Sequence, residues 1–267
     1  MTQISQKFIT IENKKIHVET IQPTTTIDNK DTPCLVFLHE GLGSIAQWRD
    51  FPHLVCEQTG LTGIVYERFN YAHSSFLPTV RTMDYMHDEA LVYLSQVLDA
   101  CDIKKSILVG HSDGGSIGLI FAAHYPEYVQ ALITEAAHVF VEEITLEGIK
   151  EAEIFFKTHN LIEKLARYHG DNAEQVFYNW FNIWMAPEFK QWNIEVFLPN
   201  IYAPVLAIQG LQDEYGTEEQ VDAIVEQVSG EAEKCMVDNC QHVPHHQAKE
   251  VVLARMVAFI KQQTIAL

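Results

Sequence analysis

The residues of this chain that are best suited to chemistry are a serine, a histidine and an aspartate. Ser112 stands at the centre of a Gly-x-Ser-x-Gly pentapeptide, between Gly110 and Gly114. A serine hydroxyl becomes an effective nucleophile only when a base takes its proton, and a carboxylate on the far side of an imidazole base fixes its tautomer. We predict that His242 is the base and Asp213 the carboxylate, so the chemistry is nucleophilic acyl transfer.

A sharp bend must position the nucleophile. The apolar run 107–109 predicts a strand that ends at the pentapeptide, and a helix of small residues follows as far as Tyr125, before Pro126. This order of strand, turn and helix forces Ser112 into a sparsely populated backbone conformation at the carboxyl end of a sheet. Both glycines are required because a Cβ would collide with the adjacent strand or helix. A plain Gly-Ser turn is the alternative for the pentapeptide alone.

The base and the acid are predicted to lie in loops that follow late strands. His242 comes after an apolar segment at 234–237, and Asp213 follows a strand expected at 204–210. Such loops can reach the serine at the carboxyl edge of the sheet. The alternatives are His245 and His246 for the base, and Glu214 and Asp238 for the acid.

Size and charge limit the classes of protein that fit. The chain has 267 residues, 47% of them hydrophobic, which allows one large α/β domain or two small ones. Lys and Arg number 18 against 36 Asp and Glu, and the net charge of −18 disfavours nucleic-acid and membrane partners. No signal peptide and no run of about 20 apolar residues is visible. Five cysteines without a Cys-x-x-Cys pair indicate reduced thiols, so the expected location is the cytoplasm.

Alternating strands and helices predict an α/β fold with a doubly wound, mostly parallel sheet. An antiparallel hairpin, expected from strands at 8–11 and 15–20, begins the chain. The further strands are expected at 34–38, 63–66, 107–109, 131–134, 204–210 and 234–237, and long helices at 83–98, 218–228 and 250–263.

The alternation is interrupted between residues 139 and 198. This stretch is helical in pattern, shows no clear strand and contains three of the four tryptophans. We therefore predict a helical cap inserted into an α/β core that comprises residues 1–138 and 199–267. Most cap aromatics should pack the helices together, and those expected to line a hydrophobic pocket are Trp180 and Trp184, together with His138. A buried, hydrogen-bonded core histidine is the alternative for His138.

The order of these motifs resembles that of the α/β-hydrolase superfamily over nearly the whole chain. The resemblance rests on residues 39–44 (His-Glu-Gly-Leu-Gly-Ser), 110–114, 210–213 and 242–245. That family uses the chain order Ser, Asp, His, and its His-x-Pro-His pattern makes the first histidine the base. The resemblance implies the α/β-hydrolase fold and a serine hydrolase.

The same resemblance implies an oxyanion hole made by two backbone N–H groups, which we assign to Gly41 and Asp113. Glu40 departs from the family, which usually has glycine there. A carboxylate aimed at the hole would oppose the negative charge that develops in it. We therefore expect the Glu40 side chain to turn away from the hole.

The leading hypothesis is a serine hydrolase that cleaves a small to medium hydrophobic ester or lactone and uses no cofactor or metal. The resemblance extends to lactone hydrolases, including quorum-quenching enzymes that open acyl-homoserine lactones. The alternative is a carbon–carbon bond hydrolase for ring-cleavage products of aromatic compounds, in which Arg68 or Arg81 would bind a dienoate carboxylate.

Two further hypotheses come from other classes. One is a ligand receptor without catalytic activity, against which an intact Ser, Asp and His argue. The other is a metal-dependent lactonase that uses His242, His245 and His246, although the chain lacks the His-x-His-x-Asp-His pattern of such enzymes. The sequence leaves the oligomeric state open.

Overall fold

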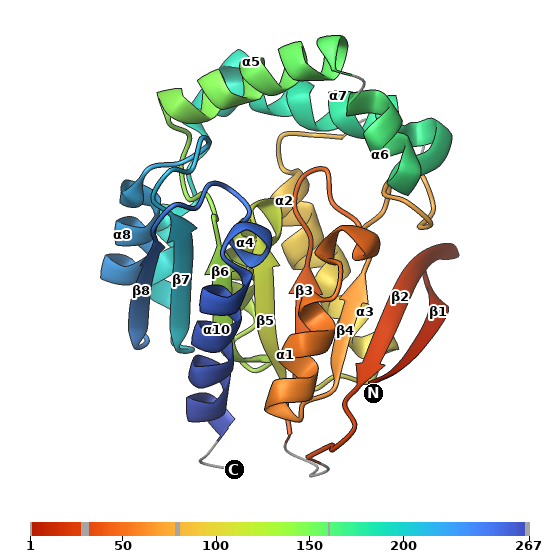
Figure 1. The fold of residues 1–267 in the computed structure, drawn as a ribbon, viewed down its shortest axis with the longest axis vertical. Coiled ribbons are helices and arrows are strands. Elements are labelled where there is room, and N and C mark those ends of the chain that lie inside the picture. Colours follow the sequence, from red (N-terminus) through yellow and green to blue (C-terminus); the bar gives the residue numbers. More distant parts are fainter. Residues whose placement is uncertain (1, 28–31, 78–80, 160, 265–267) are drawn as a thin grey trace.

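The sheet that positions the site has eight strands among the residues described by our computed structural model, which are 2–27, 32–77, 81–159 and 161–264. Their order is β1-β2-β4-β3-β5-β6-β7-β8 (Figure 1). All neighbours from β4 to β8 are parallel, whereas β2 pairs antiparallel with both β1 and β4. The predicted doubly wound, mostly parallel sheet is confirmed. The strands are β1 (Gln3–Ile11), β2 (Lys14–Gln22), β3 (Cys34–Leu38), β4 (Gly63–Tyr66), β5 (Ser106–His111), β6 (Val129–Glu135), β7 (Val205–Gly210) and β8 (Ala232–Val237).

The hairpin of β1 and β2 is longer than the sequence pattern predicts. Its turn residues Glu12 and Asn13 both have positive φ, 49° and 63°. Positive φ at both central positions matches the twist of a tight hairpin. The backbone pairing therefore continues beyond the apolar residues from which the strands were predicted.

Helices cover both faces of the sheet. On one face, α1 (Phe51–Thr59) and α10 (Lys249–Thr264) contribute to one hydrophobic cluster. On the other face, α4 (Asp113–His124) and α8 (Glu218–Gln227) contribute to a second cluster. The helix predicted at 83–98 is divided into α2 (Tyr85–Asp88), the π-helical segment η2 (Glu89–Leu94) and α3 (Ser95–Ala100). The short elements are η1 (Ile45–Trp48), η3 (Gly170–Asn172), η4 (Pro187–Gln191), η5 (Glu195–Asn200) and α9 (Pro244–Gln247).

Three helices lie above the carboxyl ends of the parallel strands (Figure 1). They are α5 (Glu143–Thr158), α6 (Leu161–His169) and α7 (Ala173–Trp184), and all fall in the stretch predicted to be a cap. Glu142 joins the start of α5 to that of α8, because its carboxylate accepts hydrogen bonds from the backbone N–H and the hydroxyl of Thr217, at 2.9 and 2.6 Å. The division into a core and a cap domain at residues 139 and 198 stays a prediction.

The composition predicts reduced cysteines and no segment apolar enough to span a membrane. All five cysteines are free. Within the described ranges, the helices are too short or too polar to cross a lipid bilayer.

Candidate active site

The bend between β5 and α4 holds Ser112 in a strained conformation. Ser112 has φ 52° and ψ −119°, a region that side chains rarely adopt, and its N–H donates to the carbonyl of Glu135 in β6 at 2.8 Å. A Cβ at Gly110 would come within 2.3 Å of the Gly114 carbonyl oxygen, and one at Gly114 within 2.0 Å of the Leu38 carbonyl oxygen. These contacts explain why glycine is required on both sides of the serine.

The structure brings Ser112, His242 and Asp213 into one hydrogen-bonded row. His242 Nε2 lies 3.0 Å from Ser112 Oγ, and His242 Nδ1 lies 2.9 and 3.0 Å from the two carboxylate oxygens of Asp213. Asp213 Oδ1 also accepts from the Tyr215 N–H at 2.8 Å, and His111 Nε2 contacts the His242 carbonyl at 2.7 Å. With its ring proton on Nδ1, facing Asp213, His242 can accept the serine proton at Nε2.

The surroundings favour the charged forms of His242 and Asp213. Burial alone would lower the pKa of His242, but Asp213, with help from Glu214 and Glu40, raises it above its ordinary value. Burial alone would raise the pKa of Asp213, but His242 and the Tyr215 N–H hold it below its ordinary value. The pair is therefore suited to stabilise the imidazolium that forms when His242 takes a proton.

The residues considered as alternatives have other positions. His245 Nδ1 lies 2.8 Å from Glu135 Oε2, and the His246 ring packs on that of His245 at 4.3 Å. Glu214 accepts the backbone N–H of His242 at 3.2 Å. Asp238 is an exposed residue after β8.

The turn that contains Glu40 and Gly41 is fixed by buried side chains that the motif analysis missed. The Glu40 carbonyl accepts hydrogen bonds from Arg68 Nη2 and His39 Nδ1, both at 2.7 Å, and the Gly41 carbonyl accepts one from Tyr71 Oη at 2.9 Å. Arg68 is 1% exposed, and its guanidinium lies over the Tyr71 ring at 4.8 Å. These contacts orient the two peptide groups that flank the Gly41 Cα, and the first of them carries the Gly41 N–H. The sequence signal was weak, since it was only a basic residue soon after a buried strand.

The side chain of Asp113 belongs to the same network. Its Oδ2 accepts from Tyr85 Oη at 2.8 Å, and Tyr85 Oη accepts from Trp184 Nε1 at 3.1 Å. Arg68 Nη1 lies 3.9 Å from the same carboxylate oxygen, so Arg68 and Asp113 form an ion pair inside the protein. As the first residue of α4, Asp113 has an N–H without an acceptor inside the helix.

Ser112 and His242 open into a pocket of about 230 Å³ under α5–α7. His138, Trp180 and Trp184 all line it, as does Gly41. His138 is also held by the Tyr215 carbonyl, 2.9 Å from its Nε2, so it is both a pocket residue and a hydrogen-bonded buried one. The other lining residues, which the sequence analysis did not assign to the pocket, are Glu40, Leu42, Gln47, Thr145, Ile149, Leu161, Leu165 and Tyr215.

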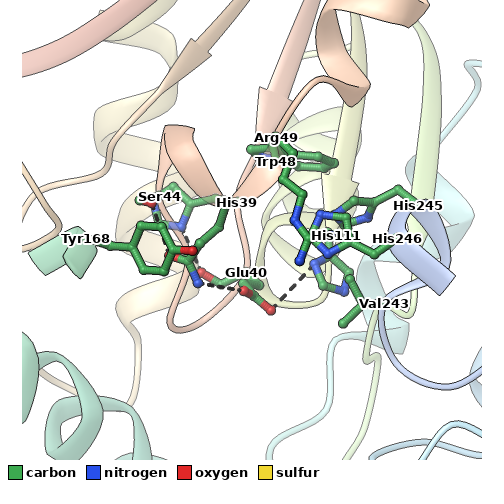
Figure 2. Close-up of a pocket in the computed structure, with 12 residues that line it drawn as sticks. His39, Glu40, Ser44, Trp48, Arg49, His111, Tyr168, Val243, His245 and His246 are labelled. Atoms are coloured by element: carbon green, nitrogen blue, oxygen red, sulfur yellow. Dashed lines mark hydrogen bonds and ion pairs between the residues drawn. The ribbon is translucent and has the colours of Figure 1, made fainter. Parts of the chain in front are cut away.

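A second, more polar pocket of about 200 Å³ adjoins the first (Figure 2). Glu40 and Gln47 line both. Figure 2 shows the Glu40 carboxylate directed toward His111, whose Nδ1 is 3.6 Å away, and Gln47 Nε2 donates to it at 3.4 Å. Burial raises the pKa of Glu40 above its ordinary value, against the opposing effect of His242.

Arg68 and Arg81, considered above as carboxylate ligands, do not line the pocket at Ser112. Arg81 Nη2 donates to Tyr71 Oη at 2.5 Å, and its guanidinium lies over the Tyr85 ring at 4.1 Å. Both arginines therefore belong to the framework behind the Gly41 turn.

Fold and site together define a hydrolase architecture, and comparison with known proteins gives the family. Residues 33–189 match the family model described as alpha/beta hydrolase fold, so the chain belongs to that family of hydrolases. The chain is 29% identical over 140 residues to the human serine hydrolase BPHL, covering 50% of this chain and 47% of that protein. It is 30% identical over 103 residues to the zebrafish (Danio rerio) sn-1-specific diacylglycerol lipase ABHD11, covering 39% of this chain and 31% of the lipase. These matches span less than half the length of either relative.

Solved structures agree with this fold over nearly the whole chain. The 2-hydroxy-6-oxo-6-phenylhexa-2,4-dienoate hydrolase BphD from Rhodococcus sp. strain RHA1 aligns with a TM-score of 0.80 at 14% identity, covering 98% of this chain and all of that one. At this identity the likeness describes the fold and leaves the substrate open.

Proposed function

We propose that this protein is a serine hydrolase that cleaves a small to medium hydrophobic ester or lactone through an acyl-enzyme on Ser112. The observation that carries the proposal is the row of contacts from Ser112 Oγ to His242 Nε2, at 3.0 Å, and from His242 Nδ1 to Asp213, at 2.9 Å. The row lies at the edge of a pocket lined mainly by apolar and aromatic side chains. Reactive polar groups beside an apolar pocket are typical of small-molecule sites.

The reaction has two half-steps. His242 takes the proton of Ser112 as the serine oxygen attacks the acyl carbon, and the N–H groups of Gly41 and Asp113 stabilise the resulting oxyanion. His242 then gives its proton to the leaving alcohol oxygen, and the carbon–oxygen bond breaks. In the second half-step, His242 takes a proton from water as the water oxygen attacks the acyl-enzyme. His242 then gives that proton to Ser112 Oγ as the acyl carbon–Oγ bond breaks, which releases the acid and free Ser112.

The pocket supports a neutral substrate of limited size. None of the described residues that line it is a lysine or an arginine, so a carboxylate group would have no cationic partner there. Its volume, about 230 Å³, is below the 300–1,000 Å³ typical of drug-sized ligands. These features favour an ester or a lactone, including an acyl-homoserine lactone of short or medium chain, over the dienoate of a carbon–carbon bond hydrolase.

A substrate panel tests the proposal. Purified wild-type protein and Ser112→Ala are assayed with p-nitrophenyl esters and acyl-homoserine lactones of increasing chain length, and with a vinylogous diketone that carries a carboxylate. We expect hydrolysis of the esters or lactones, a preference for shorter chains, and loss of activity in Ser112→Ala. Faster turnover of the diketone would instead establish the carbon–carbon hydrolase alternative.

Two controls address the remaining hypotheses. A fluorophosphonate probe should label the wild-type protein once, at Ser112, and an unlabelled protein would revive the receptor hypothesis. Activity measured well below the melting temperature should survive chelation, since loss under that condition would favour the metal-dependent lactonase.

A further inference from the structure

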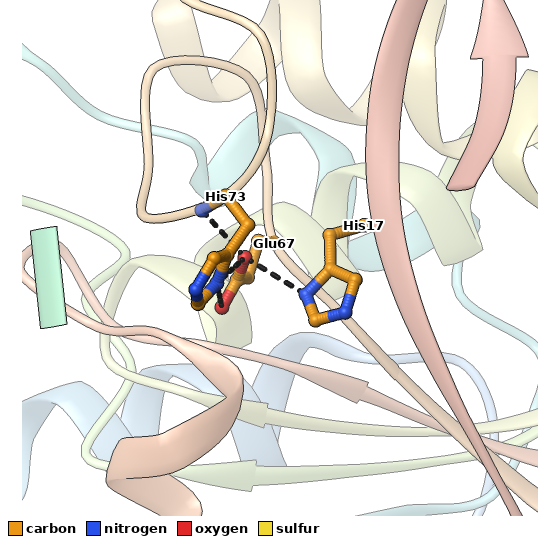
Figure 3. A group of neighbouring side chains, drawn as sticks. All are labelled: His17, Glu67 and His73. Carbon is orange, nitrogen blue, oxygen red and sulfur yellow. Dashed lines mark hydrogen bonds and ion pairs between the residues drawn. The ribbon is translucent and has the colours of Figure 1, made fainter. Parts of the chain in front are cut away.

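Three side chains with metal-binding atoms converge outside both pockets (Figure 3). His17 lies in β2, Glu67 directly follows β4, and His73 lies in the loop that continues from it. His17 Nδ1 is 3.1 Å and His73 Nδ1 is 3.2 Å from Glu67 Oε2, and the three ligand atoms all lie within 4.8 Å of one another. We propose that His17, Glu67 and His73 form a binding site for a divalent transition-metal ion, for which Zn²⁺ is the best match.

The ligand set and its spacing fit that ion. Two imidazole nitrogens and one carboxylate oxygen are common zinc ligands, with bonds of about 2.1 Å that place tetrahedral ligands about 3.4 Å apart. The two nitrogen–oxygen distances are within a few tenths of that value. The His73 side chain is 67% exposed, so it can turn toward the ion, and water can occupy the fourth position. Each imidazole would carry its proton on Nε2, with the Nδ1 lone pair facing the metal.

A closed set of hydrogen bonds holds the backbone at the site in place. The Glu67 N–H donates to the His17 carbonyl at 3.0 Å, and the His17 N–H donates to Ser74 Oγ at 3.0 Å. Ser74 Oγ in turn donates to the Glu67 carbonyl at 2.6 Å. Since Ser74 adjoins His73, all three ligands are attached to backbone that is already fixed, and less ordering is required when an ion binds.

The charge balance of Glu67 also favours a cation. Its side chain is 2% exposed, and in the part of the chain that the structure describes its ion-pair partners are only the two histidines. A buried carboxylate needs a compensating charge or several hydrogen bonds. The two imidazoles and the His73 N–H, which donates to Glu67 Oε2 at 2.9 Å, supply hydrogen bonds, and a divalent ion would add a compensating charge at the same place.

The position of the site indicates a structural role for the ion. The loop between Glu67 and His73 carries Arg68 and Tyr71, which hold the Glu40–Gly41 turn. The N–H of Ala72 in this loop lies 3.2 Å from Nδ1 of His169, the last residue of α6. A bound ion would therefore fasten to β2 the loop that supports both the turn and a helix above the pocket.

Titration of chelator-treated protein with ZnCl₂ tests the site, by isothermal calorimetry and by thermal melting. We expect the wild-type protein to bind one Zn²⁺ here and its Tm to rise with zinc concentration. His73→Ala should weaken binding by at least about tenfold and remove the rise in Tm. Because His73 is exposed, this variant is expected to remain folded.

Matched variants locate the ion. His159 is also exposed but lies just after α5, so His159→Ala should bind zinc as the wild type does. His242→Asn should also retain binding. Substituting Co²⁺ should give the visible absorption bands of a tetrahedral site, and His73→Ala should lack them. The proposal is overturned if the wild-type protein binds no zinc, if His73→Ala binds it equally well, or if His242→Asn abolishes binding.

Discussion

Two histidine–carboxylate pairs stand three positions apart in the segment after β8, and their geometry is nearly the same. His242 Nδ1 lies 2.9 Å from Asp213 Oδ1, and His245 Nδ1 lies 2.8 Å from Glu135 Oε2. The pKa values of the two pairs are shifted in opposite directions. Against the effect of burial, the pKa of His242 is raised and that of Asp213 is lowered, whereas burial lowers the pKa of His245 to about 3 and raises that of Glu135 to about 7.

The difference arises from what surrounds each pair. Further acids, Glu214 and Glu40, favour the charged form of His242. The His245 ring instead packs on Trp48 and Phe51, at 4.6 and 5.5 Å, and Arg49 disfavours its charged form. Hydrogen-bond length therefore does not determine whether such a pair is ionic. Burial dominates in the pair of His245 and Glu135, whereas charged neighbours overcome burial in the pair beside Ser112. Only the pair beside Ser112 is therefore suited to accept a proton.

The first prediction removes each histidine in turn. His242→Asn should reduce kcat/KM by about 10⁵-fold or more, because no base remains for Ser112. His245→Asn keeps an N–H donor toward Glu135 and should change kcat/KM by less than about tenfold. Ester hydrolysis by the two purified variants measures the difference. Equal losses would show that the second pair also takes part in the chemistry.

The second prediction removes each carboxylate charge. Asp213→Asn should reduce kcat/KM by about 10³–10⁴-fold, because an amide favours the wrong tautomer of His242. Glu135→Gln replaces a carboxyl group that is largely protonated below pH 7, so activity should be nearly unchanged. The same assay applies, and circular dichroism checks that both variants are folded. A large loss of activity in folded Glu135→Gln would contradict this view of the pair.

The contrast between the pairs also shows what the sequence could and could not predict. The β5–turn–α4 bend follows from local sterics at Gly110 and Gly114, and the parallel sheet follows from alternating apolar patterns. Loops at strand ends bring His242 within reach of Ser112 although 130 positions separate them. These relations depend on local pattern and on the topology of the sheet, both of which are readable in a sequence.

Contacts of side chains with segments distant in the sequence could not be predicted in this way. The bond from Tyr71 to the Gly41 carbonyl and the pairing of His245 with Glu135 have no periodicity or spacing that marks them. The π-helical segment η2 likewise interrupts a pattern that predicts one continuous helix. Packing against the rest of the molecule determines these features, so a structure is needed to find them.

The third prediction concerns the pH dependence of activity. Protonated His242 cannot accept the serine proton, so kcat/KM should fall about tenfold for each pH unit below the pKa of His242. Because that pKa is raised, the midpoint should lie above the ordinary value of 6.5. Glu135→Gln should leave the midpoint in place, whereas Asp213→Asn should lower it in the residual activity. A midpoint below 6.5 in the wild-type protein would argue against a raised pKa of His242.

The smallest expected effect is on stability, and it tests the pair of His245 and Glu135 alone. The pKa of Glu135 is about 7 in the folded protein against an ordinary value of 4.5, so the folded state holds this proton more tightly. The stabilisation is complete below pH 4.5 and is lost as the pH rises through 7. Glu135→Gln cannot ionise, so its free energy of unfolding relative to wild type should increase by up to about 3 kcal/mol between pH 4.5 and 8.

Urea unfolding at several pH values measures this difference. Glu89, another buried acid with a pKa raised to about 7, is present in both proteins and cancels in the comparison. Parallel stability curves for the two proteins would mean that Glu135 is ionised in the folded state. The pair of His245 and Glu135 would then be ionic like that of His242 and Asp213, and burial would not be the cause of a difference between them.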